Sequence, residues 1–375
     1  MVQYPIAKSS WVGKKGDRTG ECEMEAAVDV LRSGDTTMGL HVEKFEEQFA
    51  RSAGAQYCVM TNSGSSANLI ATAALCYHYG IKPGDEVIAP ALAWSTTYAP
   101  LIQYGLKIKL VDIDLDTLNY DMEKLKEAVS DKTQMLVNVH ALGNPSVLPM
   151  TWKATLADAC EAMGIEHNKN TSITTYSTFF SHHINTMEGG LAVTDDKDLY
   201  NKMLMLRAHG WTRDLPEEKY GDFNFVLPGY NVRPTEIAAA IGQVQLKWLG
   251  EFLKLRRNNA RMYKVLFGDL EHIQIQKECG SSVWFGFPFI IRPGSKLERI
   301  DVLAALRKEH IEYRYLLAGD IRQHPMVKYM NYESDEMFNV EIAHTNGFYL
   351  GNYGEDLSQQ LLKVREIFDA VSTGL

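Results

Sequence analysis

The sequence predicts an α/β protein built on a mostly parallel β-sheet, and three observations carry this prediction. Short apolar runs alternate with helical patterns between residues 56 and 139, which is typical of β-α-β units. A proline followed by an Ala-rich run predicts a strong helix at 234–246, with the proline in the first turn. The length of 375 residues suffices for more than one unit. We expect a large α/β domain over 1–245 and a smaller α+β domain over 246–375.

Each expected element follows from its local pattern. Four runs rich in aliphatic residues read as buried strands: 57–60, 86–89, 108–113 and 135–139. The segments between them have helical spacing and predict helices or helical turns at 67–75, 95–104 and 122–129. After residue 246 we expect a basic helix, a strand, and two further helices: 251–267, 283–291, 297–308 and 357–371.

Composition and charge exclude several classes of function. The 38 Lys and Arg residues against 47 Asp and Glu give a net charge of −9 with no basic run, which argues against binding to nucleic acid. No apolar stretch reaches the roughly 18–20 residues that cross a bilayer, so no membrane partner is expected. Residues 1–13 lack the apolar region of a secretion signal. Five scattered cysteines do not form a disulfide framework. We therefore expect a cytoplasmic enzyme.

Two strand ends carry candidate ligand-binding residues. Gly64 and Ser65 lie where a strand leads into a helix, where free N–H groups and the helix dipole favour an anion such as phosphate. A serine that simply caps the helix would give the same pattern. Trp94 follows the strand that ends at Pro90 and could stack on a flat heteroaromatic ring, or it could be an ordinary core or interface residue.

The segment 175–190 carries the most informative motif. Its sequence runs from Thr175 through Ser181-His182-His183 to Glu188-Gly189-Gly190. It resembles the motif of sugar aminotransferases of the DegT/DnrJ/EryC1/StrS type, in which a lysine that binds pyridoxal phosphate covalently lies six residues before the acidic residue. His182 occupies that position here. The resemblance implies an aspartate-aminotransferase-like fold (fold type I) and makes Ser177 a further cofactor-binding candidate. Apart from the resemblance, adjacent histidines would be read as surface or core residues.

Three further segments resemble the same family. The stretch 229–246 is similar to the family's Asn-x-Arg helix, which implies that Asn231 contacts the cofactor phosphate of a partner subunit in a homodimer. The stretch 207–213 resembles a dehydratase-type loop, which implies a second active-site histidine at His209 and a substrate-binding arginine at Arg213. The stretch 319–325 is similar to a loop of the small domain near the sugar, with Asp320 where the family usually has asparagine.

One region departs from the family's pattern. The resemblance implies that Asp158 pairs with the pyridine nitrogen of the cofactor and that Glu161 packs on its ring. The chain between residues 145 and 176 is short, however, for the helix and strand that the family has there. The apolar spacing within 152–163 also fits a single amphipathic helix, which would leave Asp158 on an ordinary helix and the pyridine nitrogen without a partner.

The replacement of lysine by His182 changes the expected chemistry. An imidazole cannot hold the cofactor covalently, but its ordinary pKa near ~6.5 suits proton transfer at neutral pH. Within the family this pattern is similar to the 3-dehydratases of deoxysugar synthesis, and most closely to those that act on GDP-4-keto-6-deoxymannose. The resemblance implies removal of the C3 hydroxyl of a nucleotide-linked 4-keto-6-deoxyhexose. It implies pyridoxal 5′-phosphate and pyridoxamine 5′-phosphate as cofactor forms and L-glutamate as amino donor.

The cysteine pattern argues against one related chemistry, and two alternatives stay open at this level. The related CDP-sugar dehydratases use an iron–sulfur cluster, which needs organised cysteines. The five cysteines here form no C-x-C or C-x-x-C pair, so no metal is expected. A sugar 4-aminotransferase would have to recruit another lysine, and Lys169 and Lys197 both lie outside the motif. A catalytically inactive homologue that binds a sugar nucleotide would fit the shortened 145–176 region.

Overall fold

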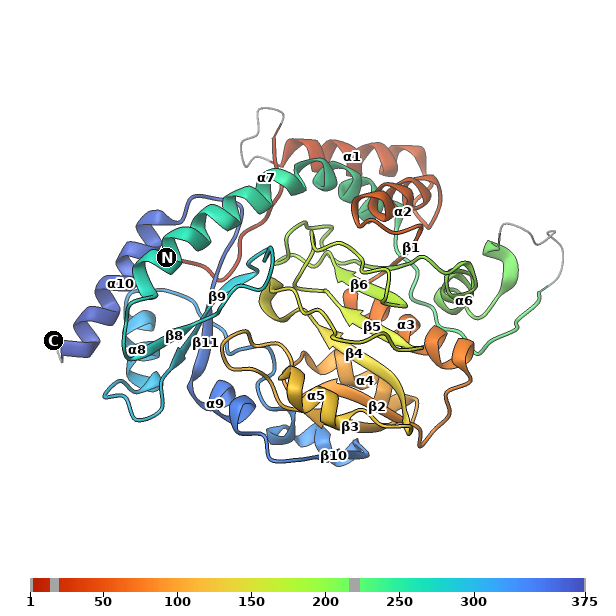
Figure 1. The fold of residues 1–375 in the computed structure, drawn as a ribbon. Coiled ribbons are helices and arrows are strands. Elements are labelled where there is room, and N and C mark those ends of the chain that lie inside the picture. Colours follow the sequence, from red (N-terminus) through yellow and green to blue (C-terminus); the bar gives the residue numbers. More distant parts are fainter. Residues whose placement is uncertain (1–2, 14–19, 216–222, 374–375) are drawn as a thin grey trace.

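The structure is a computed structural model that describes residues 3–13, 20–215 and 223–373 (Figure 1). The elements up to the fourth strand are α1 (Glu21–Ser33), α2 (Leu40–Ser52), β1 (Tyr57–Thr61), α3 (Gly64–Tyr79), β2 (Glu86–Pro90), α4 (Ser95–Gln103), β3 (Lys107–Val111), α5 (Met122–Ala128) and β4 (Thr133–Val139). Those up to the long helix are η1 (Ala141–Gly143), β5 (Thr155–Asp158), β6 (Ile173–Ser177), β7 (Gly190–Thr194), α6 (Lys197–Arg207), η2 (Thr212–Asp214) and α7 (Glu236–Phe267). The remainder are β8 (Ile273–Ile275), β9 (Gly286–Ile291), α8 (Arg299–Lys308), η3 (Ile321–Gln323), η4 (Pro325–Tyr329), β10 (Tyr332–Ser334), α9 (Phe338–Asn346), β11 (Gly347–Gly351) and α10 (Ser358–Thr373).

The large sheet has eight strands in the order β1-β7-β6-β5-β4-β2-β3-β10. Six neighbouring strands of this order, β6, β5, β4, β2, β3 and β10, are parallel to one another. The strand β7 runs antiparallel to both of its neighbours, β1 and β6. The carboxyl ends of β1, β2, β4, β5 and β6 therefore lie along the same edge of the sheet, which is where ligands bind in open α/β sheets.

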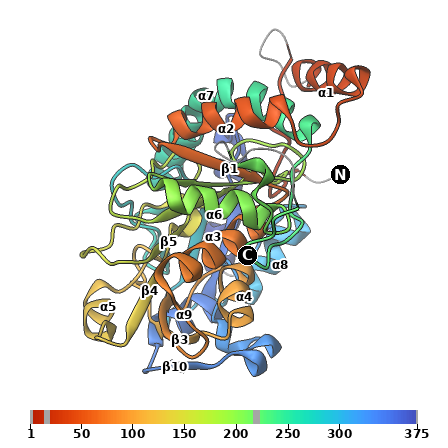
Figure 2. The same ribbon diagram turned by 90° about the vertical axis from the view of Figure 1, so that its right-hand side faces the viewer.

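Helices cover both faces of this sheet. One face packs against α3, α4 and α6 in the largest hydrophobic cluster of the chain. The other face packs against α2 and α7 near β1, β7 and β6, and against α5 near β2, β3 and β4. Figure 2 views the molecule from the side on which α6 and α3 lie. This arrangement buries the strands on both faces, which explains why they read as continuous apolar runs.

The helix α7 connects the large sheet with a second, smaller core (Figure 1). Its first half packs on α1 and α2, and its second half places Tyr263 and Phe267 against a three-stranded antiparallel sheet, β11-β9-β8. The helices α8 and α10 complete this second core. The strand β10 then returns to the edge of the large sheet beside β3, so the segment between the two parts of the small core is anchored on the large sheet.

Most expected elements are confirmed, with local corrections. The expected helices at 234–246 and 251–267 are one continuous helix, α7, and Pro234 precedes its N-cap residue Thr235 instead of lying in its first turn. The expected strand over 283–291 begins only at Gly286. Residue 245 lies inside α7, and the division into domains at 245/246 stays a prediction. Within the described ranges, no helix is long and apolar enough to cross a membrane.

Candidate active site

A cavity of about 1230 Å³ lies at the carboxyl edge of the large sheet. Its walls come from the loops that follow β1, β2, β4, β5 and β6, and from the segments 312–326 and 344–349 of the later chain. Seven of the residues predicted from the sequence line it: Gly64, Ser65, Trp94, Asp158, Glu161, Ser177 and His182. Residues that are up to 118 positions apart in the sequence therefore meet in one site.

The loop between β1 and α3 forms a cradle of backbone N–H groups. The Ser63 side chain accepts a hydrogen bond from Ser66 N at 3.1 Å and caps α3, so the predicted cap exists, but on the residue before Gly64. A Cβ on Gly64 would lie 2.7 Å from the Ser177 Cβ, so only glycine lets these two segments approach. The N-terminus of this 16-residue helix opens into the cavity, where it favours a phosphate group.

Asp158 is the last residue of β5, and the alternative that places residues 152–163 on one helix is wrong. The strand β5 pairs with β4 and β6, and the chain segments that connect these strands contain no α-helix. The short 145–176 region can therefore still complete the sheet. Asp158 Oδ2 accepts hydrogen bonds from Asn68 Nδ2 at 2.8 Å and Thr97 Oγ1 at 2.7 Å, and Oδ1 accepts one from Cys160 N at 3.1 Å. These donors stabilise a fixed carboxylate in the cavity wall.

Glu161 and Trp94 line the cavity beside Asp158. Glu161 Oε2 accepts a hydrogen bond from Leu142 N at 3.2 Å, and burial raises the pKa of its carboxyl group to about 8. Trp94 occupies the N-cap position of α4 and is 54% exposed, so it is not a core residue, and the alternative of an interface residue stays open. An exposed indole at a cavity wall can cover a flat ring.

His182 lies in the connection between β6 and β7, beside two aromatic side chains. Its imidazole centroid is 5.0 Å from that of Phe285 and 5.9 Å from that of Phe179. Burial lowers the pKa of His182 to about 3, and the charge of Arg256 adds to this effect, so the imidazole is neutral at physiological pH. Its Nδ1 is buried without a hydrogen-bond partner among the described residues.

The neighbouring His183 is a core residue. It is 1% exposed, and its Nε2 lies 3.2 Å from the carbonyl oxygen of Val283. Of the two adjacent histidines, only His182 therefore lines the cavity.

Three predicted site residues do not line the cavity within this chain. His209 Nε2 lies 2.8 Å from Arg233 Nη1, the guanidinium group of Arg213 lies 4.4 Å over the Trp211 ring, and Asn231 forms a β-bridge with Ala208. These three residues lie in neighbouring segments at the surface. Their predicted roles stay predictions.

The sequence analysis missed several residues that complete the site. Asn68 and Thr97 orient Asp158, and each lies within one helical turn of a residue that was singled out, Gly64 and Trp94. His140 follows β4, accepts a hydrogen bond from Ser146 N through Nδ1 at 2.9 Å, and lines the cavity. Its position at a strand end was a signal that could have been used. Nothing local in the sequence points to the wall residues of the small core, such as Tyr349.

The residues present fit a pyridoxal-phosphate cofactor. A Cβ would fill the Gly64 cradle, and hydrogen bonds fix the Asp158 carboxyl group for a cationic partner. His182, whose Nδ1 has no partner among the described residues, lines the same cavity. No group of three His, Cys, Asp or Glu side chains in the described parts of the chain is arranged to hold a metal ion.

Comparison with known proteins gives extensive matches. Residues 17–368 match the DegT/DnrJ/EryC1/StrS aminotransferase family. The chain is 42% identical to the GDP-4-keto-6-deoxy-D-mannose 3-dehydratase of Escherichia coli O55:H7, over 98% of this chain and 100% of that protein. It is also 42% identical to the dehydratase of the same name from Yersinia pseudotuberculosis, over 96% of this chain and 97% of the relative.

Solved structures agree with these relationships. The E. coli GDP-4-keto-6-deoxy-D-mannose-3-dehydratase with bound hydrated PLP superimposes with a TM-score of 0.92 at 41% identity, over 98% of this chain and 99% of the other. A GDP-4-keto-6-deoxymannose-3-dehydratase with a trapped PLP-glutamate geminal diamine gives a TM-score of 0.91 at 41% identity, over 97% of this chain and 100% of the other. The α/β architecture expected from the sequence, a fold of type I, is thereby confirmed. The chain belongs to the DegT/DnrJ/EryC1/StrS aminotransferase family.

Proposed function

We propose that this chain removes the C3 hydroxyl group of GDP-4-keto-6-deoxymannose with pyridoxal 5′-phosphate and pyridoxamine 5′-phosphate as cofactor forms and L-glutamate as amino donor. One observation carries this proposal: His182, and no lysine of the described residues, lines the cavity. The similarity to two 3-dehydratases over nearly their full length points to the same activity. A 4-aminotransferase would need a lysine there, so this alternative has no support in the cavity wall.

Each end of the cavity has a defined task in this function. Gly64 and Ser65, at the N-terminus of α3, and Ser177 would bind the cofactor phosphate. Trp94 would cover one face of the ring. Asp158 would keep a proton on the pyridine nitrogen, because three hydrogen-bond donors hold its carboxyl group in place in the cavity wall. The cofactor, when bound, supplies an electron sink next to the reacting sugar carbons.

His182 would act as the base. Its imidazole is unprotonated at neutral pH, because burial disfavours the charged form and lowers the pKa, and a neutral imidazole has a nitrogen free to accept a proton. It would take the proton from the C4′ carbon of the cofactor and pass it to the C3 hydroxyl, which would leave as water. Phe179 and Phe285 border the imidazole. Without a covalent bond to the protein, the amine form of the cofactor stays available for the 4-keto group of the sugar.

The same proposal includes a homodimer in which Asn231 serves the phosphate of the partner subunit and in which His209 and Arg213 reach the partner's cavity. These three residues lie outside the cavity of their own chain, which fits a role across an interface. The helix α1 adds support, because Met24, Val28 and Leu31 form an exposed apolar stripe with helical spacing. Light scattering tests this part: a monomer that is fully active would contradict it.

Product analysis tests the proposed activity. The purified protein is incubated with GDP-4-keto-6-deoxymannose, pyridoxal phosphate and L-glutamate, and the products are analysed by mass spectrometry together with an assay for ammonia. We expect a 3-deoxy product and released ammonia, and a loss of activity by about 10²–10⁴-fold in His182→Asn. A 4-amino sugar as product would establish an aminotransferase. The absence of any change in the cofactor spectrum on addition of glutamate would establish an inactive binding protein.

A further inference from the structure

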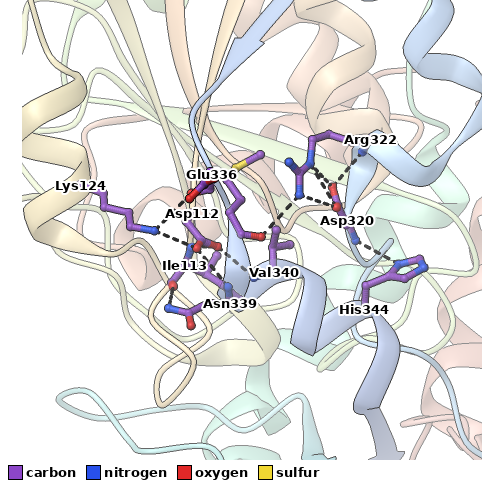
Figure 3. Close-up of polar contacts among 10 residues, drawn as sticks. Asp112, Ile113, Lys124, Asp320, Arg322, Glu336, Asn339, Val340 and His344 are labelled. Atoms are coloured by element: carbon purple, nitrogen blue, oxygen red, sulfur yellow. Dashed lines mark hydrogen bonds and ion pairs between the residues drawn. The ribbon is translucent and has the colours of Figure 1, made fainter. Parts of the chain in front are cut away.

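The helix α9 carries a histidine, His344, that lines the cavity and has no role in the function proposed above. The helix is fixed to the large sheet at its N-terminus. Asp112, which directly follows β3 and is 1% exposed, accepts hydrogen bonds from Asn339 N at 3.1 Å and Val340 N at 2.9 Å. Lys124 Nζ lies 3.0 Å from Asp112 Oδ2 (Figure 3). The charged cap and its ion pair hold α9 in one position relative to the sheet.

The imidazole of His344 is fixed by the loop at Gly319 and Asp320. Asp320 N donates a hydrogen bond to His344 Nδ1 at 3.2 Å (Figure 3). Gly319 has a φ of +65°, and a Cβ there would lie 2.3 Å from His344 Nδ1, so this close approach requires glycine. The Asp320 side chain is fully buried and accepts three hydrogen bonds of 2.8–3.1 Å from the Arg322 guanidinium group, which fixes the loop.

These contacts determine which nitrogen of each histidine carries its proton. Because His344 Nδ1 accepts a hydrogen bond and burial lowers the pKa of this residue, the ring is neutral with its proton on Nε2. His324 has the opposite arrangement: its Nε2 donates to Ala318 O at 2.6 Å, so Nδ1 is the nitrogen available to another partner. The two rings lie 6.3 Å apart in an edge-to-face geometry, and both line the cavity. No described residue bonds His344 Nε2 or His324 Nδ1.

We propose that His344 and His324 together bind a ring hydroxyl group of the substrate hexose, His344 as donor through Nε2 and His324 as acceptor through Nδ1. This inference rests on the proposed function. A hydroxyl group both donates and accepts hydrogen bonds and so satisfies both nitrogens, whereas a phosphate oxygen only accepts and would leave His324 Nδ1 unpaired. GDP-4-keto-6-deoxymannose has free ring hydroxyls only at C2 and C3. The ribose of GDP carries hydroxyl groups as well, so the affinity for GDP distinguishes a contact with the hexose from a contact with the nucleotide.

Two variants separate this role from the structural role of each ring. His344→Asn retains an acceptor for Asp320 N near the position of Nδ1 and removes the donor at Nε2. His324→Gln retains a donor for Ala318 O near the position of Nε2 and removes the acceptor at Nδ1. His272→Asn, on a residue outside the cavity lining, serves as the matched control. Isothermal titration calorimetry measures the Kd of GDP-4-keto-6-deoxymannose and of GDP for the protein loaded with pyridoxal phosphate, without amino donor, so that no turnover occurs.

The ratio of the two Kd values is the readout. We expect each variant to bind the sugar nucleotide about tenfold more weakly with an unchanged Kd for GDP. We also expect the double variant to lose less than the product of the two effects, since both nitrogens bind one group. An equal loss of GDP affinity would mean a contact with the nucleotide and would overturn the inference, as would an unchanged ratio in both variants. If the wild-type protein forms the 3-deoxy product but the variants have the wild-type ratio of Kd values, only this inference is refuted. If the wild-type protein forms no 3-deoxy product, the proposed function is refuted.

Discussion

Replacement of Asp158 by asparagine tests whether this carboxylate serves the pyridine nitrogen of the cofactor. Three donors, Asn68 Nδ2, Thr97 Oγ1 and Cys160 N, lie 2.7–3.1 Å from its two oxygens. An asparagine has the same shape but only one acceptor oxygen and no charge, so it loses the charge-assisted interaction with a protonated ring nitrogen. Such an interaction contributes roughly 1.5–3 kcal/mol, so we expect the affinity for pyridoxal phosphate to fall roughly 10- to 150-fold.

A fluorescence titration of the protein without cofactor measures this affinity at 25 °C. Asp196→Asn is the matched control, because Asp196 caps α6 with two backbone hydrogen bonds and lies outside the cavity lining. Thermal unfolding of both variants without cofactor separates a loss of stability from a loss of affinity. If Asp158→Asn bound the cofactor within twofold of the wild-type affinity, Asp158 would not be the partner of the pyridine nitrogen, and the assignment of the site would be wrong.

Three further changes have defined outcomes. Gly190→Ala places a Cβ 2.1 Å from Ser63 O, and we expect urea unfolding to show a loss of about 1–3 kcal/mol together with weaker binding of the cofactor phosphate. Burial lowers the pKa of His140 to about 4, below the ~6.5 of the unfolded chain. As the pH falls from ~6.5 to about 4, the unfolded chain binds a proton that the folded protein does not, so the folded state loses stability. His140→Asn should abolish a loss of about 2 kcal/mol in unfolding free energy between pH 8 and pH 5, whereas His272→Asn should retain it. Trp94→Ala should weaken cofactor binding about 2- to 13-fold without a change in the unfolding temperature, since the indole is half exposed; an unchanged affinity would show that Trp94 does not stack on the ring.

The elements that follow local periodicity could be predicted from the sequence. The strands β1 to β4 and the helices between them have strong apolar patterns, and their positions agree with the structure. The strand β5 could not be predicted in this way, because Thr155–Asp158 is only four residues long and lies beside apolar residues with helical spacing. Pairing with both β4 and β6 outweighs that local pattern. The short strand β10 is assigned by its partner β3 for the same reason.

Gly64, Ser65 and Trp94 could be found because each follows a predicted strand, and strand ends share one edge of a parallel sheet. His182, Asp158, Glu161 and Ser177 were recognised through the resemblance to the family. The loop 319–325 was singled out through the family resemblance, and Gly319, Ile321 and His324 of this loop line the cavity. His344 could not be found, because α9 reaches the cavity only through tertiary contacts such as the one between Val340 N and Asp112. A single sequence holds no local signal for contacts between segments more than 200 residues apart.

Reduction with borohydride tests most directly the claim that His182 replaces the lysine that binds the cofactor covalently. The protein is loaded with pyridoxal phosphate, treated with borohydride and analysed by mass spectrometry as the intact chain, with His182→Lys as the positive control. We expect no added mass on the wild-type chain and one reduced cofactor on His182→Lys, because only an amine forms the reducible bond. One cofactor on a lysine of the wild-type chain would contradict an untethered cofactor and, with it, the proposed 3-dehydratase.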